Sequence, residues 1–441
     1  MFSLHKLYNY YKIMISLENL FEEVDKIDKQ TIMSLITTLC SIDTTVPPGS
    51  SYREYIDAIC PMFEELGYTL EEVILPNNLI NQIPYNIEGS RINLVATKNF
   101  GQKQEVSFFS HMDVVPAVDE GDDKWKFPPF KPTLKGGKIF GRGVGDNKGA
   151  MVCLILALRI IKDFNIVPNY NINVLSCTDE ELGFYPGARY LAEKGYAKGA
   201  IFSMDFSVDP ILLMGSAGNL DVEIETIGRS SHSGLSFMGV NALEAMVPIL
   251  VELIKLKKNV ESRQSKDIPG FPDSIGAQKK NLTPLLNLDV IKAGQKSNII
   301  PGICHLIINR RIIPDEKYED VKKEILDAIE RGKEKSNALD VKVRFDYSYP
   351  SLKVDINSPD VQKIKNIIIK VHNIPENKIR KQGMAITFDV GFVAQLLNTQ
   401  NIIIRGVTYG GSNTHGVNEN IRIKDMKKFI KEILAFLCGD F

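Results

Sequence analysis

The chain has few cysteines, and they follow no regular pattern. Six are spread over 441 residues without a CxxC pair or an evenly spaced framework. Most lie in apolar runs, where a thiol is expected to be buried. Buried free thiols of this kind are typical of a reducing compartment, so the sequence predicts a cytoplasmic protein.

Long apolar runs and an excess of charge of one sign are also missing. No stretch of about 18 uncharged apolar residues occurs, and the N-terminus lacks the apolar core and cleavage site of a signal peptide. Met14 is an alternative to Met1 as the start, because the amphipathic helical pattern begins only after it. The net charge is −1, with acidic and basic residues interspersed. Neither a nucleic acid nor a membrane is therefore an expected partner.

The length and the apolar pattern indicate two domains, because 441 residues exceed one ordinary core. Hydrophobic residues make up 44% and charged residues 24%, as in globular proteins. Helical periodicity is found at 16–43, 51–66, 148–163 and 186–195. Short apolar runs that predict buried strands are found at 106–110, 172–176, 200–204 and 401–404. This alternation predicts an α/β domain with a central mixed or parallel sheet flanked by helices.

Between residues 217 and 350 the pattern changes to half-exposed, alternating strands. The predicted strands and helices follow one another at 221–226, 240–257, 284–292, 303–312, 316–332 and 341–347. This β-α-β-β-α-β order predicts a compact α+β unit, inserted into a first domain that comprises 1–216 and 351–441. The segment 262–282, rich in Lys, Gln, Pro and Gly, is expected to be a solvated excursion.

Five short islands of His, Asp and Glu are the most informative feature of the sequence. They lie at 110–113, 143–149, 178–183, 203–205 and 413–416. Four of the predicted strands end at or just before an island, and ligands of α/β sheets gather at the carboxyl ends of strands. We therefore expect the islands to converge. Two histidines and three carboxylates could hold a pair of divalent metals, with one carboxylate to spare, which indicates a hydrolase.

Three of the islands also have a simpler interpretation. His111 could be an ordinary strand-end histidine, but Asp113 could fix its second ring nitrogen, as ligating imidazoles require. Asp146 follows several glycines, but the strict spacings of nucleotide-binding loops are absent, which favours a carboxylate that bridges two metals. Glu180 and Glu181 could cap a helix. In extended backbone their side chains diverge, so that one could bind metal while the other serves as general base.

The remaining candidates lie further along the chain. Asp205 ends a predicted strand, with Asp209 as an alternative ligand nearby. His415 lies in a glycine-rich loop, whose polar surroundings favour a side chain that is accessible to ligands over one that packs in the core. His232 follows the first strand of the inserted unit and could reach across to stabilise a tetrahedral oxyanion. The other histidines are expected to be structural, and they are His5, His305 and His372.

Together these motifs resemble the di-zinc amidohydrolase family of aminoacylase, glutamate carboxypeptidase, acetylornithine deacetylase, succinyl-diaminopimelate desuccinylase and cytosolic dipeptidases. The resemblance covers roughly residues 85–440. It rests on the segments 110–116, 125–130, 141–149, 178–183, 298–301, 311–314 and 415–419. It implies a di-zinc catalytic domain and an inserted lid domain through which the chain forms a homodimer.

The resemblance also implies a ligand set for two divalent metal ions. His111 and Asp205 would bind one zinc, Glu181 and His415 would bind the other, and Asp146 would bridge them. A cis peptide bond is implied after the bridging aspartate. Cobalt or manganese could occupy such nitrogen and oxygen sites in place of zinc.

The catalytic and substrate-binding roles follow from the same resemblance. Glu180 would be the general base, and Asp113 would orient the neighbouring imidazole. On the lid, His232, Asn298 and Arg311 would contact the substrate. In this family the lid histidine often serves a neighbouring protomer, which is the reason to expect a dimer.

Two positions bear on the choice of substrate. Asn309 stands where an aspartate is common in the family, two residues before the lid arginine. Asp205 is typical of dipeptidases and aminopeptidases, whereas glutamate there is typical of deacylases and carboxypeptidases.

The sequence therefore predicts a cytosolic dipeptidase or exopeptidase that uses two metals to activate water, with a glutamate as general base. The alternative is an N-acyl amino acid deacylase of the acetylornithine or succinyl-diaminopimelate type, so the expected substrate is a dipeptide or an N-acyl amino acid. A catalytically silent homologue is disfavoured by the complete set of ligands.

Overall fold

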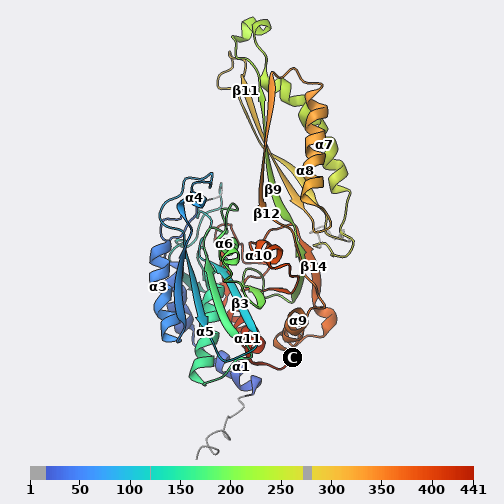
Figure 1. Cartoon of the computed structure of the whole chain (residues 1–441). Coiled ribbons are helices and arrows are strands. Elements are labelled where there is room, and N and C mark those ends of the chain that lie inside the picture. The colour runs from blue at the N-terminus through green and yellow to red at the C-terminus, as the bar shows by residue number, and fades with distance from the viewer. Residues whose placement is uncertain (1–15, 120, 272–280) are drawn as a thin grey trace, which may run out of the picture.

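The computed structural model describes residues 16–119, 121–271 and 281–441. Both candidate starts and His5 lie outside these residues, as does the middle of the predicted excursion at 262–282. The described chain contains two large sheets, each with a hydrophobic core of its own. They form a broad lower body and a narrow upper lid (Figure 1).

The central sheet of the body is mixed, as the sequence predicts. Its strands are β1 (Thr69–Ile74), β2 (Ile92–Lys98), β6 (Asn171–Cys177), β3 (Glu105–His111), β7 (Ala200–Ser203) and β15 (Ile402–Ile404), in that spatial order. The last four run parallel, and β1 and β2 form an antiparallel edge. The parallel strands are buried along most of their length, because helices cover both faces of such a sheet.

The helices of the body lie around this sheet (Figure 1). Their bounds are α1 (Leu17–Lys26), α2 (Lys29–Cys40), α3 (Tyr52–Glu65), α4 (Asn77–Ile80), α5 (Lys148–Asp163), α6 (Gly187–Glu193), α9 (Pro359–His372), α10 (Val390–Leu397) and α11 (Ile423–Cys438). The helical periodicity over 16–43 is confirmed, and the structure divides this stretch into two helices, α1 and α2. Asp28 begins the second helix by accepting a hydrogen bond from the Thr31 amide at 2.8 Å.

The lid has the predicted β-α-β-β-α-β order. It consists of β9 (Gly218–Ile227), α7 (Ala242–Glu261), β10 (Leu285–Ala293), β11 (Ile303–Ile312), α8 (Tyr318–Lys333) and β12 (Asp340–Tyr349). The four strands pair antiparallel in the order β10-β11-β9-β12, and both helices pack on one face of the sheet (Figure 1). The exact domain limits at 216/217 and 350/351 stay a prediction, and β9 and β12 begin and end close to them.

Several short elements lie outside the two large sheets. These are β4 (Thr133–Lys135), β5 (Lys138–Phe140), β8 (Ile211–Ser216), β13 (Leu352–Lys353), β14 (Arg380–Met384), β16 (Asn420–Arg422), the 3-10 helix η2 (Ser233–Met238) and the 3-10 helix η3 (Glu376–Lys378). Strand β8 leads directly into the lid, and β13 and β14 pair with it on either side.

Two further features concern the state of the cysteines and the length of the apolar helices. All six cysteines are free thiols, and four of them are buried. Within the described residues, no helix is both long enough and apolar enough to cross a membrane.

Candidate active site

The polar islands converge where the parallel strands end. His111 is the last residue of β3, Glu180 and Glu181 follow β6, Asp205 follows β7, and His415 lies in the loop after β15. Except for His111, these side chains line one cavity of about 620 Å³, which Asp146 also lines. Parallel strands place their carboxyl ends at one edge, which explains why residues so distant in sequence meet here.

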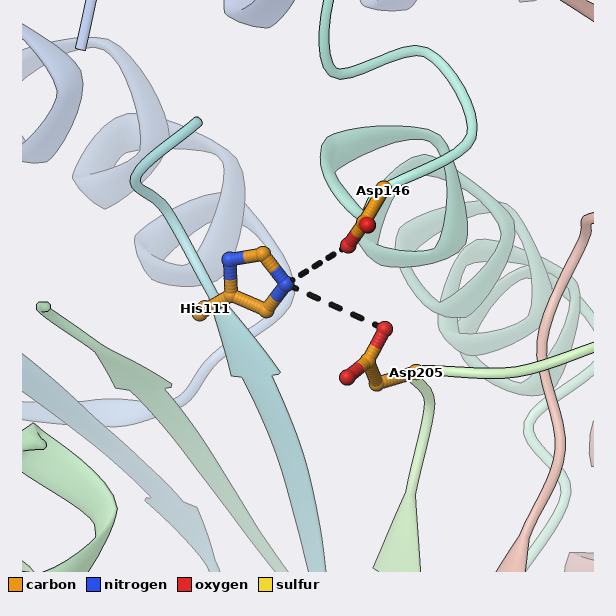
Figure 2. Close-up of side chains that lie close together, drawn as sticks. All are labelled: His111, Asp146 and Asp205. Carbon is orange, nitrogen blue, oxygen red and sulfur yellow. Dashed lines mark hydrogen bonds and ion pairs between the residues drawn. The ribbon is translucent and has the colours of Figure 1, made fainter. Parts of the chain in front are cut away.

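A first group of possible metal ligands consists of His111, Asp146 and Asp205 (Figure 2). The Nε2 atom of His111 lies 2.9 Å from Oδ1 of Asp146 and 3.9 Å from Oδ1 of Asp205. The three side chains approach from β3, from the loop before α5 and from the end of β7.

A second group shares the same aspartate. Nε2 of His415 lies 3.1 Å from Oδ2 of Asp146 and 3.1 Å from Oε1 of Glu181. In both groups the ligand atoms lie within 4.8 Å of one another, and a third such group joins His111 with Glu180 and Glu181. Each group therefore fits a divalent cation, and Asp146 offers one oxygen to each of the first two. The peptide bond after Asp146 is cis, as the family resemblance implies.

The raised pKa values of the carboxylates in the cavity indicate a site for cations. Burial raises the pKa of Glu180 well above its usual value, and burial beside Asp146 raises the pKa of Glu181 to about 7. Burial also raises the pKa of Asp205, to which the charge of Asp146 adds. Crowded carboxylates of this kind are costly to ionise in a protein interior unless positive charge compensates them.

The two histidines supply part of that compensation. Hydrogen bonds to Asp146 and Glu181 raise the pKa of His415 to about 11. Burial opposes a charge on His111, but its contacts with Asp146 and Asp205 outweigh burial and raise its pKa. Despite burial, the hydrogen bonds from both imidazoles keep the pKa of Asp146 below its usual value.

Asp113 lies behind the first histidine, but its contacts differ from the predicted ones. Nδ1 of His111 lies 3.0 Å from the backbone carbonyl of Asp113 and 3.7 Å from its carboxylate. The carboxylate instead accepts a hydrogen bond from the backbone amide of Glu181 at 2.8 Å. Asp113 thus contacts the imidazole mainly through its backbone, while its side chain holds the neighbouring glutamate segment.

Glu180 and Glu181 do not lie in extended backbone, so that expectation is wrong. They follow Asp179, which has a φ of +61°, and they form a turn in which the Gly183 amide donates to the Glu180 carbonyl at 3.1 Å. The turn places both carboxylates at the cavity, where an extended strand would separate them.

Two buried arginines fix the loops that carry Asp146, His415 and Asp205. Arg142 pairs with Glu419 at 2.7 Å and donates to the His415 carbonyl at 2.9 Å, and Glu419 in turn accepts from the Asp146 amide at 3.2 Å. Arg405 donates to the carbonyls of 208, 209 and 211, just after Asp205. These loops are therefore held by charged hydrogen bonds from behind the site.

The lid contributes one predicted residue to the cavity, namely Arg311. His232 and Asn298 lie beside each other at the opposite end of the lid, where the Ser233 amide donates to the Asn298 carbonyl at 3.0 Å. Strand β9 has ten residues, roughly 30 Å at about 3.3 Å per residue, and it separates His232 from the cavity. Neither residue lines the cavity of its own chain. The expectation that His232 reaches across to the active site is therefore wrong within a single chain.

Asp209, His305 and Asn309 make contacts that the sequence alone does not show. Asp209 belongs to none of the three ligand groups, and its carboxylate accepts from the Gly410 amide at 3.2 Å. His305 does have an acidic neighbour, because Glu225 faces it across the sheet at 3.2 Å. Asn309 donates to Asn219 and to Asp221, each at 2.6 Å, so an aspartate at 309 would face a second carboxylate.

Sequence reasoning missed several residues that line the cavity. Asn219 and Tyr349 do so at the two places where the chain enters and leaves the lid, which is the signal that could have found them. The segment 384–388 forms an apolar wall with Phe206. Nothing in its sequence pattern marks it, because it is a loop after a short strand that the periodicity did not predict.

The fold and the paired histidine–carboxylate groups are those of a metal-dependent hydrolase. The chain belongs to peptidase family M20/M25/M40, whose model matches residues 108–438. It is thus an M20 family metallohydrolase.

Relatives and solved structures with different activities resemble this chain. The N-formyl-4-amino-5-aminomethyl-2-methylpyrimidine deformylase of Bacillus subtilis is 25% identical over 439 residues, which cover 93% of this chain and 95% of the relative. A probable succinyl-diaminopimelate desuccinylase of Staphylococcus epidermidis is 30% identical over 243 residues, 52% of this chain and 58% of that protein. A dipeptidase of Saccharomyces cerevisiae shares the fold, with a TM-score of 0.74, 17% identity and coverage of 96% and 98%.

Metal binding to the metal-free protein is expected to release protons. At neutral pH His415 is protonated, since its pKa is raised to about 11, and a ligating imidazole must be neutral. Zinc affinity should therefore rise with pH over the whole range from 6 to 9. Calorimetric titration in buffers of different ionisation enthalpy measures the number of protons released.

The exposed His305 provides the control for that titration. The variant His305→Gln should release the same number of protons as the wild type, because this histidine lies on the lid sheet. Binding without proton release at pH 7 would contradict the assignment of His415 as a ligand.

Proposed function

We propose that this chain is a cytosolic exopeptidase that hydrolyses dipeptides with the aid of two divalent metal ions. The observation that carries the proposal is the composition of one cavity. All members of the histidine–carboxylate groups except His111 line it, and Arg311 of the lid lines it as well. Among the described residues, Asp221 and Asp289 act on Arg311 through their charge but form no hydrogen bond with it, so its guanidinium is available for the carboxylate of a substrate.

Each residue of the metal groups receives a role in this proposal. His111 and Asp205 would hold one ion, Glu181 and His415 would hold the other, and Asp146 would contribute to both. Zinc suits these nitrogen and oxygen ligands, with cobalt or manganese as alternatives. When bound, the ions act as Lewis acids and make water a better nucleophile at neutral pH.

Glu180 is the general base of the proposed reaction. It lines the cavity next to both groups, and burial raises its pKa, which strengthens it as a proton acceptor. It takes a proton from the attacking water and delivers it to the nitrogen of the leaving amine. Arg311 meanwhile orients the substrate by its carboxylate.

The charges of the cavity favour substrates with one carboxylate. Among the described residues that line it, Arg311 is the single lysine or arginine. An N-succinyl substrate would bring a further carboxylate for which the lining offers no cation, and an unpaired carboxylate is costly to bury. The apolar wall of 384–386, Phe206 and Phe388 favours an apolar group beside the scissile bond.

One observation supports deacylation of an N-acyl amino acid as a second candidate. Every carboxylate that lines the cavity belongs to the metal groups, so the free ammonium of a dipeptide would have no separate counter-charge. A neutral formyl or acetyl group needs none. The names of two relatives, a deformylase and a desuccinylase, are compatible with this alternative.

The test of the proposed function is hydrolysis of a mixed panel by the zinc-loaded protein, with and without chelator. The panel contains apolar and acidic dipeptides and N-formyl, N-acetyl and N-succinyl amino acids. Chelator-sensitive cleavage of apolar dipeptides is the expected result. Cleavage confined to N-formyl or N-acetyl amino acids would move the assignment to the deacylases.

The variant Glu180→Gln separates chemistry from metal binding in the same assay. Its kcat should fall by about 10²–10⁴ while two metal ions stay bound, since general base catalysis contributes on that order. The exposed Glu64→Gln on α3 is the matched control and should retain full activity. Near-normal turnover of Glu180→Gln would contradict the role of Glu180 as general base.

Replacement of Arg311 tests how the substrate is anchored. Hydrogen bonds to charged groups contribute about 1.5–3 kcal/mol, so Arg311→Met should lower kcat/KM by roughly 10–100-fold on substrates with a free carboxylate. On the corresponding C-terminal amides, which lack that charge, the variant and the wild type should differ little. The control is Arg344→Met, because Arg344 pairs with Glu223 on the exposed lid sheet.

We further propose that two copies of the chain associate through the lid. One face of α7 exposes Leu243, Val247, Val251 and Ile254, each between 39% and 49% accessible. Their spacing of four, four and three residues places them in one stripe. His232 and Asn298 support a second copy as the occupant, because at the far end of the lid they can reach only the site of another molecule.

The double variant Val247→Glu with Val251→Glu should convert a dimer into a monomer, because four carboxylates, two from each copy, would be buried at a symmetric contact. Light scattering after gel filtration measures the mass. Leu326→Glu, which alters a single exposed apolar residue of α8, should leave the mass unchanged. A monomeric wild type at micromolar concentration would contradict the proposal.

A further inference from the structure

A buried cluster lies behind the turn that carries Glu180. The carboxylate of Asp179 accepts a hydrogen bond from the Tyr52 hydroxyl at 2.7 Å and pairs with Nε of Arg91 at 3.2 Å. All three side chains are fully buried. None of them lines the active-site cavity or belongs to a group of possible metal ligands.

The cluster is built to hold one carboxylate. Arg91 also donates to the carbonyls of Pro48 and Gly49, at 2.7 and 3.0 Å, so its position is fixed from the N-terminal segment. Its guanidinium lies 5.2 Å above the ring of Tyr52. In the part of the chain that the structure describes, Nε of Arg91 and Oδ2 of Asp179 make no hydrogen bond, so their ion pair is the contact that compensates the burial of both atoms.

The backbone at Asp179 explains why such a clamp is needed. Its φ of +61° lies in the left-handed region, which residues other than glycine, asparagine and aspartate seldom adopt. This conformation turns the chain off the end of β6 and directs the next residue, Glu180, to the cavity. The turn is held at two further points, by Tyr349 on the Glu180 carbonyl and by Asp113 on the Glu181 amide.

We propose that Asp179, clamped by Arg91 and Tyr52, is a positioning residue that sets the place of the Glu180 carboxylate. The inference rests on the proposed function, because it assumes that Glu180 is the general base. Arg91 and Tyr52 precede the segment 108–438 that matches the family model, so the clamp comes from a part of the chain outside that match. Asp179 acts through its neighbour and contacts neither substrate nor metal.

The test compares Asp179→Asn and Asp179→Ala with the zinc-loaded wild type. Asparagine tolerates the left-handed backbone and still accepts from Tyr52, whereas alanine does neither. A misplacement of about 1 Å can cost 10²-fold in rate, so kcat should fall at least tenfold in Asp179→Ala and be largely rescued in Asp179→Asn. KM should stay within threefold and the metal content at two ions per chain.

Tyr52→Phe keeps the test decisive should Asp179→Ala not fold, because it preserves the ring and removes one hydroxyl. Its kcat should lie between those of the wild type and Asp179→Ala, again at constant KM. Arg53→Met is the control and should match the wild type. Arg53 lies on the same helix as Tyr52, and its exposed side chain pairs with Glu72 of β1. Unchanged kcat in Tyr52→Phe and in Asp179→Ala would overturn the proposal, as would a loss explained by lost metal.

A crystal structure of Asp179→Ala distinguishes failure of the positioning role from failure of the proposed function. Displacement of the Glu180 carboxylate, with His111 and Asp146 in place, supports the positioning role even for a protein that cleaves nothing in the panel. An unmoved Glu180 carboxylate would overturn it whatever the substrate proves to be.

Discussion

The interaction on which the rest of the structure depends is the repulsion among carboxylates gathered at one end of a parallel sheet. Asp146, Glu180, Glu181 and Asp205 share a partly enclosed cavity with no lysine beside them. Two imidazoles cannot neutralise four carboxylates, which explains why burial raises the pKa values of three of them. The surrounding fold must hold this arrangement together in the face of that repulsion, and divalent cations would remove most of it.

The loops around the cavity are held by buried arginines, one behind each part of the rim. Arg91 holds the turn before Glu180, Arg142 holds the loops of Asp146 and His415, and Arg405 holds the segment after Asp205. Each of these arginines is less than 3% exposed. Ion pairs and backbone carbonyls accept most of their N–H groups, although Nε of Arg142 makes no hydrogen bond. The three guanidinium charges thus lie just behind the carboxylates of the cavity.

The sequence predicted the regular parts of this arrangement and missed those that depend on distant contacts. Strands β3, β6 and β7 could be predicted because they contain short, mainly apolar runs. His111 and Asp205 could be predicted from the ends of two of these strands. The half-exposed edge strand β1 carries no such run. The turn at Glu180 could not be predicted, because the conformation of Asp179 is stabilised by Arg91 and Tyr52, which precede it by 88 and 127 positions. The pairing of His305 with Glu225 could not be predicted for a similar reason, since Glu225 lies on the neighbouring strand β9.

The donor geometry of the buried arginines restricts which residues these positions can tolerate. Arg405 donates to both carboxylate oxygens of Glu432 and to three backbone carbonyls in a separate loop. A planar guanidinium serves so many acceptors because its five N–H groups point outward in fixed directions, whereas an ammonium group has only three. Exchange of arginine for lysine is often regarded as conservative. Here it would leave carbonyls of the rim without donors, so charge alone does not define the requirement at these sites.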